Sequence, residues 1–188
     1  MKKLALLFVA MLMPTMFFAQ EHLDFRGVPI DGHIDDFVSK MEGLGYVLDK
    51  KADNIATMNG KFTGRDVELY VFSSLKTKTV WKVVMYFDKG SWSSLKSDYF
   101  EYKKLYTQKY GKPPASYEYF SDPYYEGDGY ELQALRKEKC HYFSMYNVEA
   151  GLLAVQISEY EQLKIAYEDK ANTELKRNEQ TSSALDEI

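Results

Sequence analysis

The chain has 188 residues, of which 45% are hydrophobic and 28% charged, so it can form one or two domains with a packed core and is not a disordered polypeptide. Its 24 basic and 28 acidic residues give a net charge of −4 and no overall basic field for a nucleic-acid backbone, so we expect no sequence-independent binding to DNA or RNA. The single cysteine, Cys140, excludes an intramolecular disulfide and a cysteine-based zinc site.

The first segment, residues 1–19, has the pattern of a secretory signal peptide. Two lysines precede ten uncharged residues (4–13), a run too short for a transmembrane helix, which needs about 20. Cleavage after Ala19 would leave 22 basic and 28 acidic residues and a net charge of −6. Because no cysteine lies near this site, we expect no lipid anchor. The sequence therefore predicts an exported protein, periplasmic or extracellular, without a membrane anchor.

Residues 20–90 predict one helix followed by four strands. The apolar side chains of the helix recur every three or four positions and form one stripe: Ile34, Phe37, Val38, Met41 and Leu44. Gly32 stands at the expected N-cap, and Gly43 and Gly45 at the expected end. Strands are expected at residues 46–50, 55–62, 65–74 and 79–87. The last of them is apolar on both faces, so the pattern does not assign its core side.

Residues 91–170 predict the same order of elements. Ser91 is the expected N-cap of a second helix that ends at Gly111. Its apolar stripe consists of Trp92, Leu95, Tyr99, Tyr102 and Tyr106. Strands are expected at residues 115–120, 139–147, 152–158 and 162–169. A polar insertion, residues 121–138, follows the first of these strands, and residues 171–188 form a polar tail, either a short helix or a frayed end.

The two units resemble each other in sequence at their last strand. Residues 82–89 and 163–170 share a pattern that ends in Tyr-x-Asp-Lys both times, 81 residues apart. The short connection at residues 147–151 suits an antiparallel hairpin. The sequence therefore predicts an α+β fold, a tandem repeat of a helix plus a four-stranded antiparallel sheet.

A helix on one face of such a sheet, repeated about every 80 residues, resembles the fold of the β-lactamase inhibitory protein and similar uncharacterised secreted bacterial proteins. The resemblance covers about residues 24–170 and rests on element order and repeat length. No residue motif is shared, so no functional residue is carried over. The inhibitor's disulfides have no counterpart in a chain with one cysteine. The resemblance implies a non-enzymatic, protein-binding role.

Few residues have a catalytic pattern. Cys140 and His141 are adjacent on a predicted strand and point to opposite faces, so we expect Cys140 to be a small core residue rather than a nucleophile. The other histidines, His22 and His33, have no histidine three or four residues away, so no helical metal pair exists. The short motifs of phosphate loops, hydrolase nucleophile elbows and zinc proteases are absent. The carboxylate pair of a glycosidase leaves no short motif, so this class stays open.

The insertion contains the best candidate for a metal site, because Asp122, Glu126, Asp128 and Glu131 lie close together in sequence. Calcium binds six to eight oxygen ligands, often from acidic loops. The spacing does not match an EF-hand, and Asp-Pro and Gly-Asp-Gly are common in turns. We interpret the segment as a solvated loop, with a calcium site as the alternative, and expect no cofactor.

Tyrosine is unevenly distributed: thirteen of the sixteen tyrosines lie between Tyr99 and Tyr167. Several belong to the buried stripe of the second helix. Others lie on a strand and in the polar insertion, where burial is harder to arrange: Tyr117, Tyr119, Tyr124, Tyr125 and Tyr130. Tyrosine offers a large contact area, a hydroxyl group and few rotatable bonds. These five are candidate binding residues, and the alternative is that they pack the insertion onto the sheet.

These patterns predict a secreted or periplasmic, non-enzymatic protein that binds another protein or a peptide through a sheet face and the Tyr-rich second unit. The alternative is a carbohydrate-binding or carbohydrate-active envelope protein, since tyrosine rings also stack on sugars. A third class, an envelope hydrolase, requires two carboxylates about 5–10 Å apart in a pocket. A flat aromatic patch with a charged rim would favour protein binding.

Overall fold

The computed structural model describes residues 21–188, so the predicted signal peptide lies outside the described residues. The first half contains β1 (Asp24–Phe25), β2 (Val28–Pro29), α1 (Ile34–Gly43), β3 (Val47–Ala52), β4 (Ile55–Phe62), β5 (Arg65–Ser73) and β6 (Val80–Lys89). The second half contains α2 (Trp92–Tyr110), β7 (Ala115–Phe120), α3 (Glu131–Arg136), β8 (Cys140–Val148), β9 (Gly151–Ile157), β10 (Gln162–Asp169) and α4 (Lys170–Asp186). The predicted α+β class and antiparallel sheet are confirmed.

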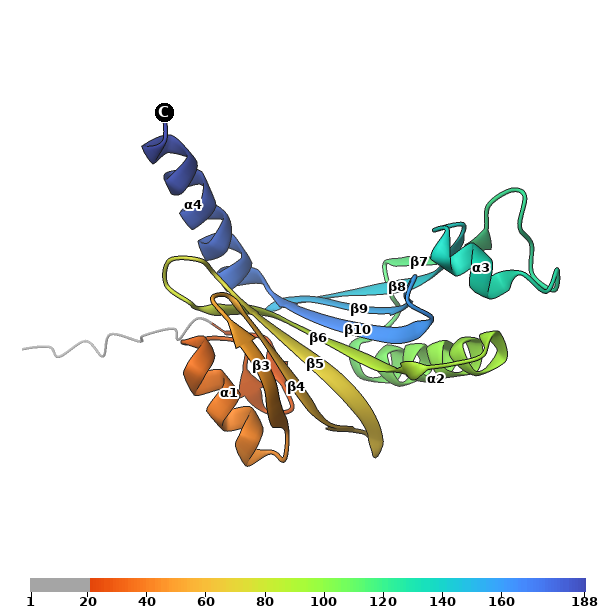
Figure 1. Cartoon of the computed structure of the whole chain (residues 1–188), viewed down its shortest axis with the longest axis horizontal. Coiled ribbons are helices and arrows are strands. Elements are labelled where there is room, and N and C mark those ends of the chain that lie inside the picture. The colour runs from red at the N-terminus through yellow and green to blue at the C-terminus, as the bar shows by residue number, and fades with distance from the viewer. Residues whose placement is uncertain (1–20) are drawn as a thin grey trace, which may run out of the picture.

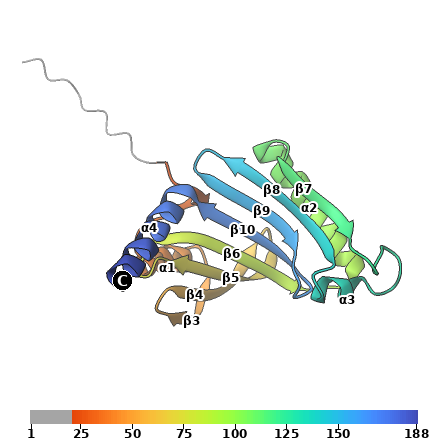
Figure 2. The same cartoon turned by 90° about the horizontal axis from the view of Figure 1, so that it is seen from above.

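Eight strands form one continuous sheet in the order β3-β4-β5-β6-β10-β9-β8-β7. Every neighbouring pair in this order is antiparallel. The last strand of each half, β6 or β10, lies at the centre, where the two strands pair with each other (Figure 2). The remaining strands, β1 and β2, form a separate small hairpin that the sequence patterns did not predict.

The helices α1 and α2 lie on the same side of the sheet, which we call the covered face (Figure 1). The opposite side, the open face, has α4 at one end and α3 at the other. Strand residues alternate between the faces. For example, Leu69 of β5, Met85 of β6 and Ile165 of β10 are fully buried against the covering helices in a single hydrophobic core.

Much of the tyrosine excess of the second half belongs to this core. Six tyrosines between α2 and the strands are buried: Tyr99, Tyr102, Tyr106, Tyr142, Tyr146 and Tyr167. Their hydroxyl groups have partners, as burial of a polar atom requires. The Tyr99 hydroxyl lies 2.6 Å from the Ser144 hydroxyl, and the hydroxyls of Tyr106 and Tyr167 bond to each other. The number of tyrosines alone is therefore not a sign of a binding surface.

The predicted helix stripes are confirmed except at Leu44, which is the C-cap of α1 and 39% exposed because the helix ends before it, and one N-cap also differs. In α1 the N-cap is His33 instead of Gly32, because the His33 imidazole accepts a hydrogen bond from the Asp35 backbone N–H. Gly32 instead adopts a positive φ of 74° immediately before the cap, a conformation that favours glycine. In α2 the predicted cap, Ser91, accepts from the Ser94 backbone N–H.

The insertion and the tail differ from the sequence expectations. Residues 121–138 contain a six-residue helix, α3, whose Ala134 and Leu135 are buried. The tail is a 17-residue helix, α4, longer than the predicted short helix or frayed end. The Asp169 carboxylate caps α4 by accepting from the Asn172 backbone N–H, and it also accepts from the Leu23 N–H. Among residues 21–188, no helix combines the length and apolar character needed to cross a bilayer.

Candidate functional site

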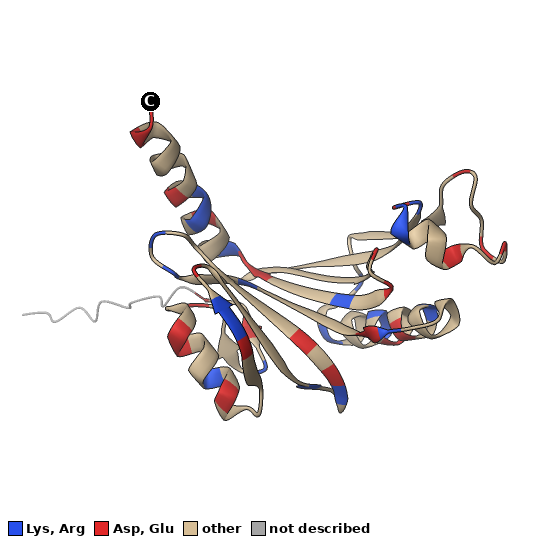
Figure 3. Ribbon diagram, in the orientation of Figure 1, with Lys and Arg blue, Asp and Glu red and all other residues tan. Residues whose placement is uncertain are grey.

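The register of the sheet places a row of side chains across the open face, one from each of the eight strands. These are Val47, Asn59, Glu68, Tyr86, Lys164, Gln156, Phe143 and Tyr117. Beside this row, the three central strands carry small residues, Val84, Ala166 and Ala154. Figure 3 shows charged residues of both signs on the strands and on the helices. The open face therefore carries aromatic, small and scattered charged residues, and α1 and α2 leave it uncovered.

One hollow of about 610 Å³, which we call the Tyr86 hollow, lies over β5, β6 and β10. It is lined by five aromatic residues, two aliphatic residues, four charged residues and one amide: Tyr70, Phe72, Trp81, Tyr86, Tyr160, Ile55, Val84, Glu68, Lys82, Lys89, Lys164 and Gln162. The rings contact one another. Tyr70 and Tyr86 meet edge to face at 5.5 Å, and Tyr86 and Tyr160 at 6.4 Å. Such contacts fix the rings as a rigid wall.

The charges of the Tyr86 hollow differ in their pairing. Lys82 Nζ lies 3.2 Å from a Glu168 carboxylate oxygen. Lys164 Nζ lies 5.7 Å from the Tyr86 ring centre and makes no ion pair within residues 21–188. Burial lowers the pKa of Lys164, since removal from water disfavours the charged form; the charge of Glu159 partly opposes this shift, and the charge of Lys82 adds a smaller lowering. Burial also raises the pKa of Tyr86 to about 12.

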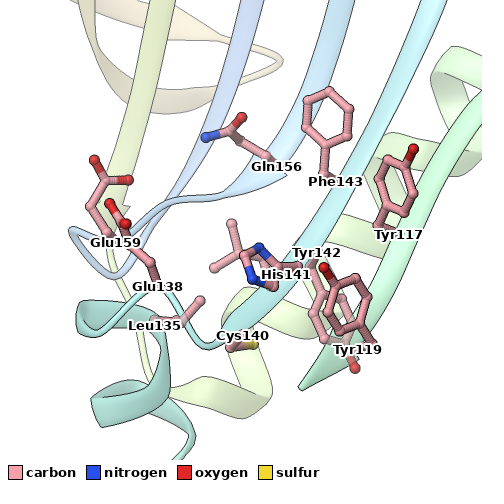
Figure 4. A pocket seen from close by; sticks show the side chains of 11 residues that line it. Tyr117, Tyr119, Leu135, Glu138, Cys140, His141, Tyr142, Phe143, Gln156 and Glu159 are labelled. Carbon is pink, nitrogen blue, oxygen red and sulfur yellow. The ribbon is translucent and has the colours of Figure 1, made fainter. Parts of the chain in front are cut away.

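A second hollow of about 360 Å³, the His141 hollow, lies on the open face near α3 (Figure 4). The Tyr119 and His141 rings are 4.8 Å apart, and Tyr117 stacks on Phe143 at 6.3 Å. The acidic lining residues, Glu138 and Glu159, lie on the side opposite the two tyrosines in Figure 4. This hollow therefore combines aromatic rings with acidic groups, whereas the Tyr86 hollow combines them with lysines.

The five tyrosines predicted as binding residues fall into three environments. Tyr117 and Tyr119 line the His141 hollow with 54% and 49% of their surface exposed. Tyr125 and Tyr130 are exposed in the insertion loop, at 66% and 61%, and line neither hollow. Tyr124 is partly buried and packs against the core, as the alternative reading of the insertion expects. The two hollows thus draw on only two of the five candidates.

The acidic cluster of the insertion bonds to the protein itself. The Asp128 carboxylate accepts from the backbone N–H groups of Tyr125 and Tyr130 at 3.1 and 2.7 Å. Glu131 accepts from the Gly127 N–H, and Glu126 pairs with Lys96. Within the described part of the chain, no group of three or more His, Cys, Asp or Glu side chains has an arrangement that could hold a metal ion. These carboxylates stabilise the loop.

The surroundings of the cysteine and the histidines indicate structural roles and not catalytic ones. Cys140 is buried on the covered face, where burial raises the pKa of its thiol to about 12, and the adjacent His141 lies on the open face. A thiol with this pKa is a poor nucleophile at neutral pH. His22 Nδ1 lies 3.2 Å from the buried Asp169 carboxylate at the start of α4. None of the histidines is placed as a base for the cysteine.

Sequence reasoning missed most of the Tyr86 hollow. Its aromatic residues Tyr70, Phe72, Trp81 and Tyr86 come from β5 and β6 of the first half, outside the Tyr-rich segment. A signal was present, because the segment at residues 79–87 is apolar on both faces. A strand that carries aromatic residues on a face without covering helices exposes them.

No family model, no curated protein and no solved structure matches this chain.

Proposed function

We propose that this chain is an exported, non-enzymatic binding protein that recognises a segment of another protein on the open face of its sheet. The observation that carries the proposal is the pair of aromatic hollows on a sheet face that α1 and α2 leave uncovered. Uncovered aromatic surface is uncommon on soluble proteins unless it contacts something. Protein interfaces are enriched in Tyr, Trp and Phe at their centre and in polar groups at their rim.

The proposal includes a tandem origin for the sheet. Each half contains a helix followed by four strands of the large sheet, beside the β1–β2 hairpin of the first half and α3 and α4 of the second. The strand order reads outward from β6 in one direction and from β10 in the other. These features support a duplicated unit, as the resemblance to the β-lactamase inhibitory protein implies. A duplicated sheet would supply a surface twice as wide as that of one unit. The two halves of that surface could then carry different charges.

A second candidate, carbohydrate binding, is favoured by one observation. The rings of Tyr117 and Tyr119 are half exposed, with Tyr117 beside Phe143 and Tyr119 beside His141, as in a stacking platform for a sugar ring. Sugar recognition also requires side chains that hydrogen-bond to hydroxyl groups. The Tyr86 hollow has one uncharged amide, Gln162, whose Nε2 already donates to the Phe87 carbonyl at 2.8 Å. Seven of the twelve residues that line this hollow are aromatic or aliphatic, so it suits the apolar side chains of a protein.

The proposal is tested by affinity capture, in which the immobilised protein and three of its variants are each incubated with the native cell extract. Tyr86→Ala and Tyr117→Ala remove rings from the two hollows, whereas Phe100→Ala removes a ring that is 40% exposed on α2, on the other side of the sheet. We expect a captured protein to be lost with the first two variants and retained with the third. Equal capture by all three would overturn the proposal, and so would capture of an oligosaccharide in place of a protein.

A further inference from the structure

Lys164 lies at the centre of the open face. It is on β10, and in the sheet register its neighbours are Tyr86 on β6 and Gln156 on β9. Two other partly buried lysines provide a comparison, since Lys82 pairs with Glu168 and Lys103 with Glu118. Lys164 has no such partner among residues 21–188. The protein therefore holds one ammonium group partly out of water, over a tyrosine ring, with no carboxylate at ion-pair distance among residues 21–188; Glu159 acts on it only from farther away.

An ammonium group without an ion-pair partner in this position lowers the stability of the free protein, because burial removes more hydration than the distant charge of Glu159 replaces. The lowered pKa of Lys164 reflects the same cost. A carboxylate brought by a ligand would remove this cost and gain a charge-assisted hydrogen bond in a site shielded from water. The surrounding aromatic wall would at the same time contact apolar groups next to that carboxylate.

We propose that Lys164 anchors a carboxylate of the partner, an Asp or Glu side chain flanked by aromatic or aliphatic residues in an extended segment that lies in the Tyr86 hollow. This inference rests on the proposed function and adds the chemistry of the partner. The lining of the hollow contains three lysines and one glutamate, and Lys176 of α4 adds a further ammonium group 4.8 Å from the Trp81 ring. The charge complementary to this site is negative, although the whole chain is acidic.

A peptide source of the carboxylate fits this site better than an acidic sugar. The tyrosine rings at the floor meet one another edge to face, at 79° for Tyr70 and Tyr86, which leaves a corrugated surface instead of one flat platform. Aliphatic and aromatic side chains fill such a surface well. The Gln162 amide is already bonded to the Phe87 carbonyl, and seven of the twelve lining residues are aromatic or aliphatic, which favours the apolar neighbours of a peptide carboxylate.

The fluorescence of Trp81 reports on this hollow directly. The chain has two tryptophans, and Trp92 packs against Phe120 and Tyr142 away from the hollow, so a Trp92→Phe background leaves Trp81 as the only reporter. The probes are the acetylated tripeptide amides Phe-Glu-Phe and Phe-Gln-Phe, which differ in one charge, and trigalacturonate as an acidic sugar. We expect the glutamate peptide to bind about tenfold more tightly than the glutamine peptide, the usual effect of one charge-assisted contact.

The variant Lys164→Met should abolish this tenfold preference, whereas Lys82→Met, which removes a lysine already paired with Glu168, should retain it. Equal affinities for the two peptides, a preference that persists in Lys164→Met, or tighter binding of trigalacturonate would each overturn the inference. The two failures are distinguishable. If the partner captured through Tyr86 and Tyr117 is still captured by Lys164→Met with unchanged affinity, the role of Lys164 is wrong and the binding face stands. If Tyr86→Ala and Tyr117→Ala also capture it unchanged, the proposed function is wrong.

Discussion

The two faces of the central sheet are both rich in aromatic residues, yet they use them in opposite ways. On the covered face, rings such as Tyr99 and Tyr106 are buried and their hydroxyl groups are bonded within the protein. On the open face, Tyr86, Tyr117 and their neighbours contact one another, line two hollows and leave Lys164 without a partner. The comparison teaches that a tyrosine's role follows from the face it occupies, and not from the local abundance of tyrosine.

The largest expected difference between the faces is in stability. Tyr99→Ala on the covered face should lower the free energy of unfolding by about 3–5 kcal/mol, because it opens a cavity and removes one of the two hydroxyl partners of Ser144. Tyr70→Ala on the open face should cost about 1 kcal/mol or less, since its ring is only partly buried. Urea unfolding followed by circular dichroism measures both values. Equal losses would remove the distinction between the faces.

A second prediction concerns the end of the covered face, where Asp169 joins β10 to α4. Asp169→Ala should lower the free energy of unfolding by about 2–3 kcal/mol, because it removes an N-cap and leaves the buried Leu23 N–H unpaired. Limited proteolysis should then cut within α4 earlier than in the wild type. If α4 is cleaved at an unchanged rate, the Asp169 contacts do not stabilise the folded position of α4.

The hydroxyl pair of Tyr106 and Tyr167 gives a smaller effect with a distinct signature. Tyr106→Phe alone leaves the buried Tyr167 hydroxyl without its partner and should cost about 1–2 kcal/mol. The double variant with Tyr167→Phe removes both polar atoms and should recover most of this loss. A double-mutant cycle in urea measures the coupling, and strictly additive losses would contradict the pairing.

The smallest effect has the opposite sign. Lys164→Met should raise the free energy of unfolding by about 1 kcal/mol at neutral pH, because it removes a partly buried charge without a partner. The folded protein depresses the pKa of Lys164, so the cost of this charge is fully present at pH values below that lowered pKa. It disappears as pH rises toward the usual lysine pKa of about 10.4.

The gain from Lys164→Met should therefore shrink between neutral and alkaline pH, measured as the difference between the two proteins' urea midpoints. Taking the difference cancels the titration of the buried tyrosines, which both proteins share. A gain in stability that stays constant with pH would show that the gain does not come from removing the Lys164 charge. A loss of stability in Lys164→Met would show that other groups of the folded protein stabilise that charge.

Periodicity predicted most of the fold because the covered face imposes it. The stripes of α1 and α2 and the bounds of β4, β7 and β10 follow from which side chains must be buried together. The junction at Asp169 and the helix α4 could not be predicted in the same way, since polar capping contacts between distant segments leave no periodic pattern. The N-cap of α1 was misassigned because Gly32 and His33 are both compatible with a helix start.

The candidate site was only partly predictable. Tyr117 and Tyr119 stood out because they alternate on a strand, but Tyr124 could not be distinguished from them until its packing against the core was known. The Tyr86 hollow draws its residues from several strands that are distant in sequence, and only the central pairing of β6 with β10 brings Lys164 beside Tyr86. A single sequence does not specify that pairing.

The central claim, that the open face binds a protein partner, is tested most directly by site-specific photo-crosslinking in the native cells. The photoreactive amino acid p-benzoylphenylalanine replaces Tyr86, Tyr117 or, on the covered side, Phe100. The account predicts that one protein is crosslinked from the positions of Tyr86 and Tyr117 and is absent from crosslinking at Phe100. Crosslinks of the same yield from all three positions, or from Phe100 alone, would contradict it.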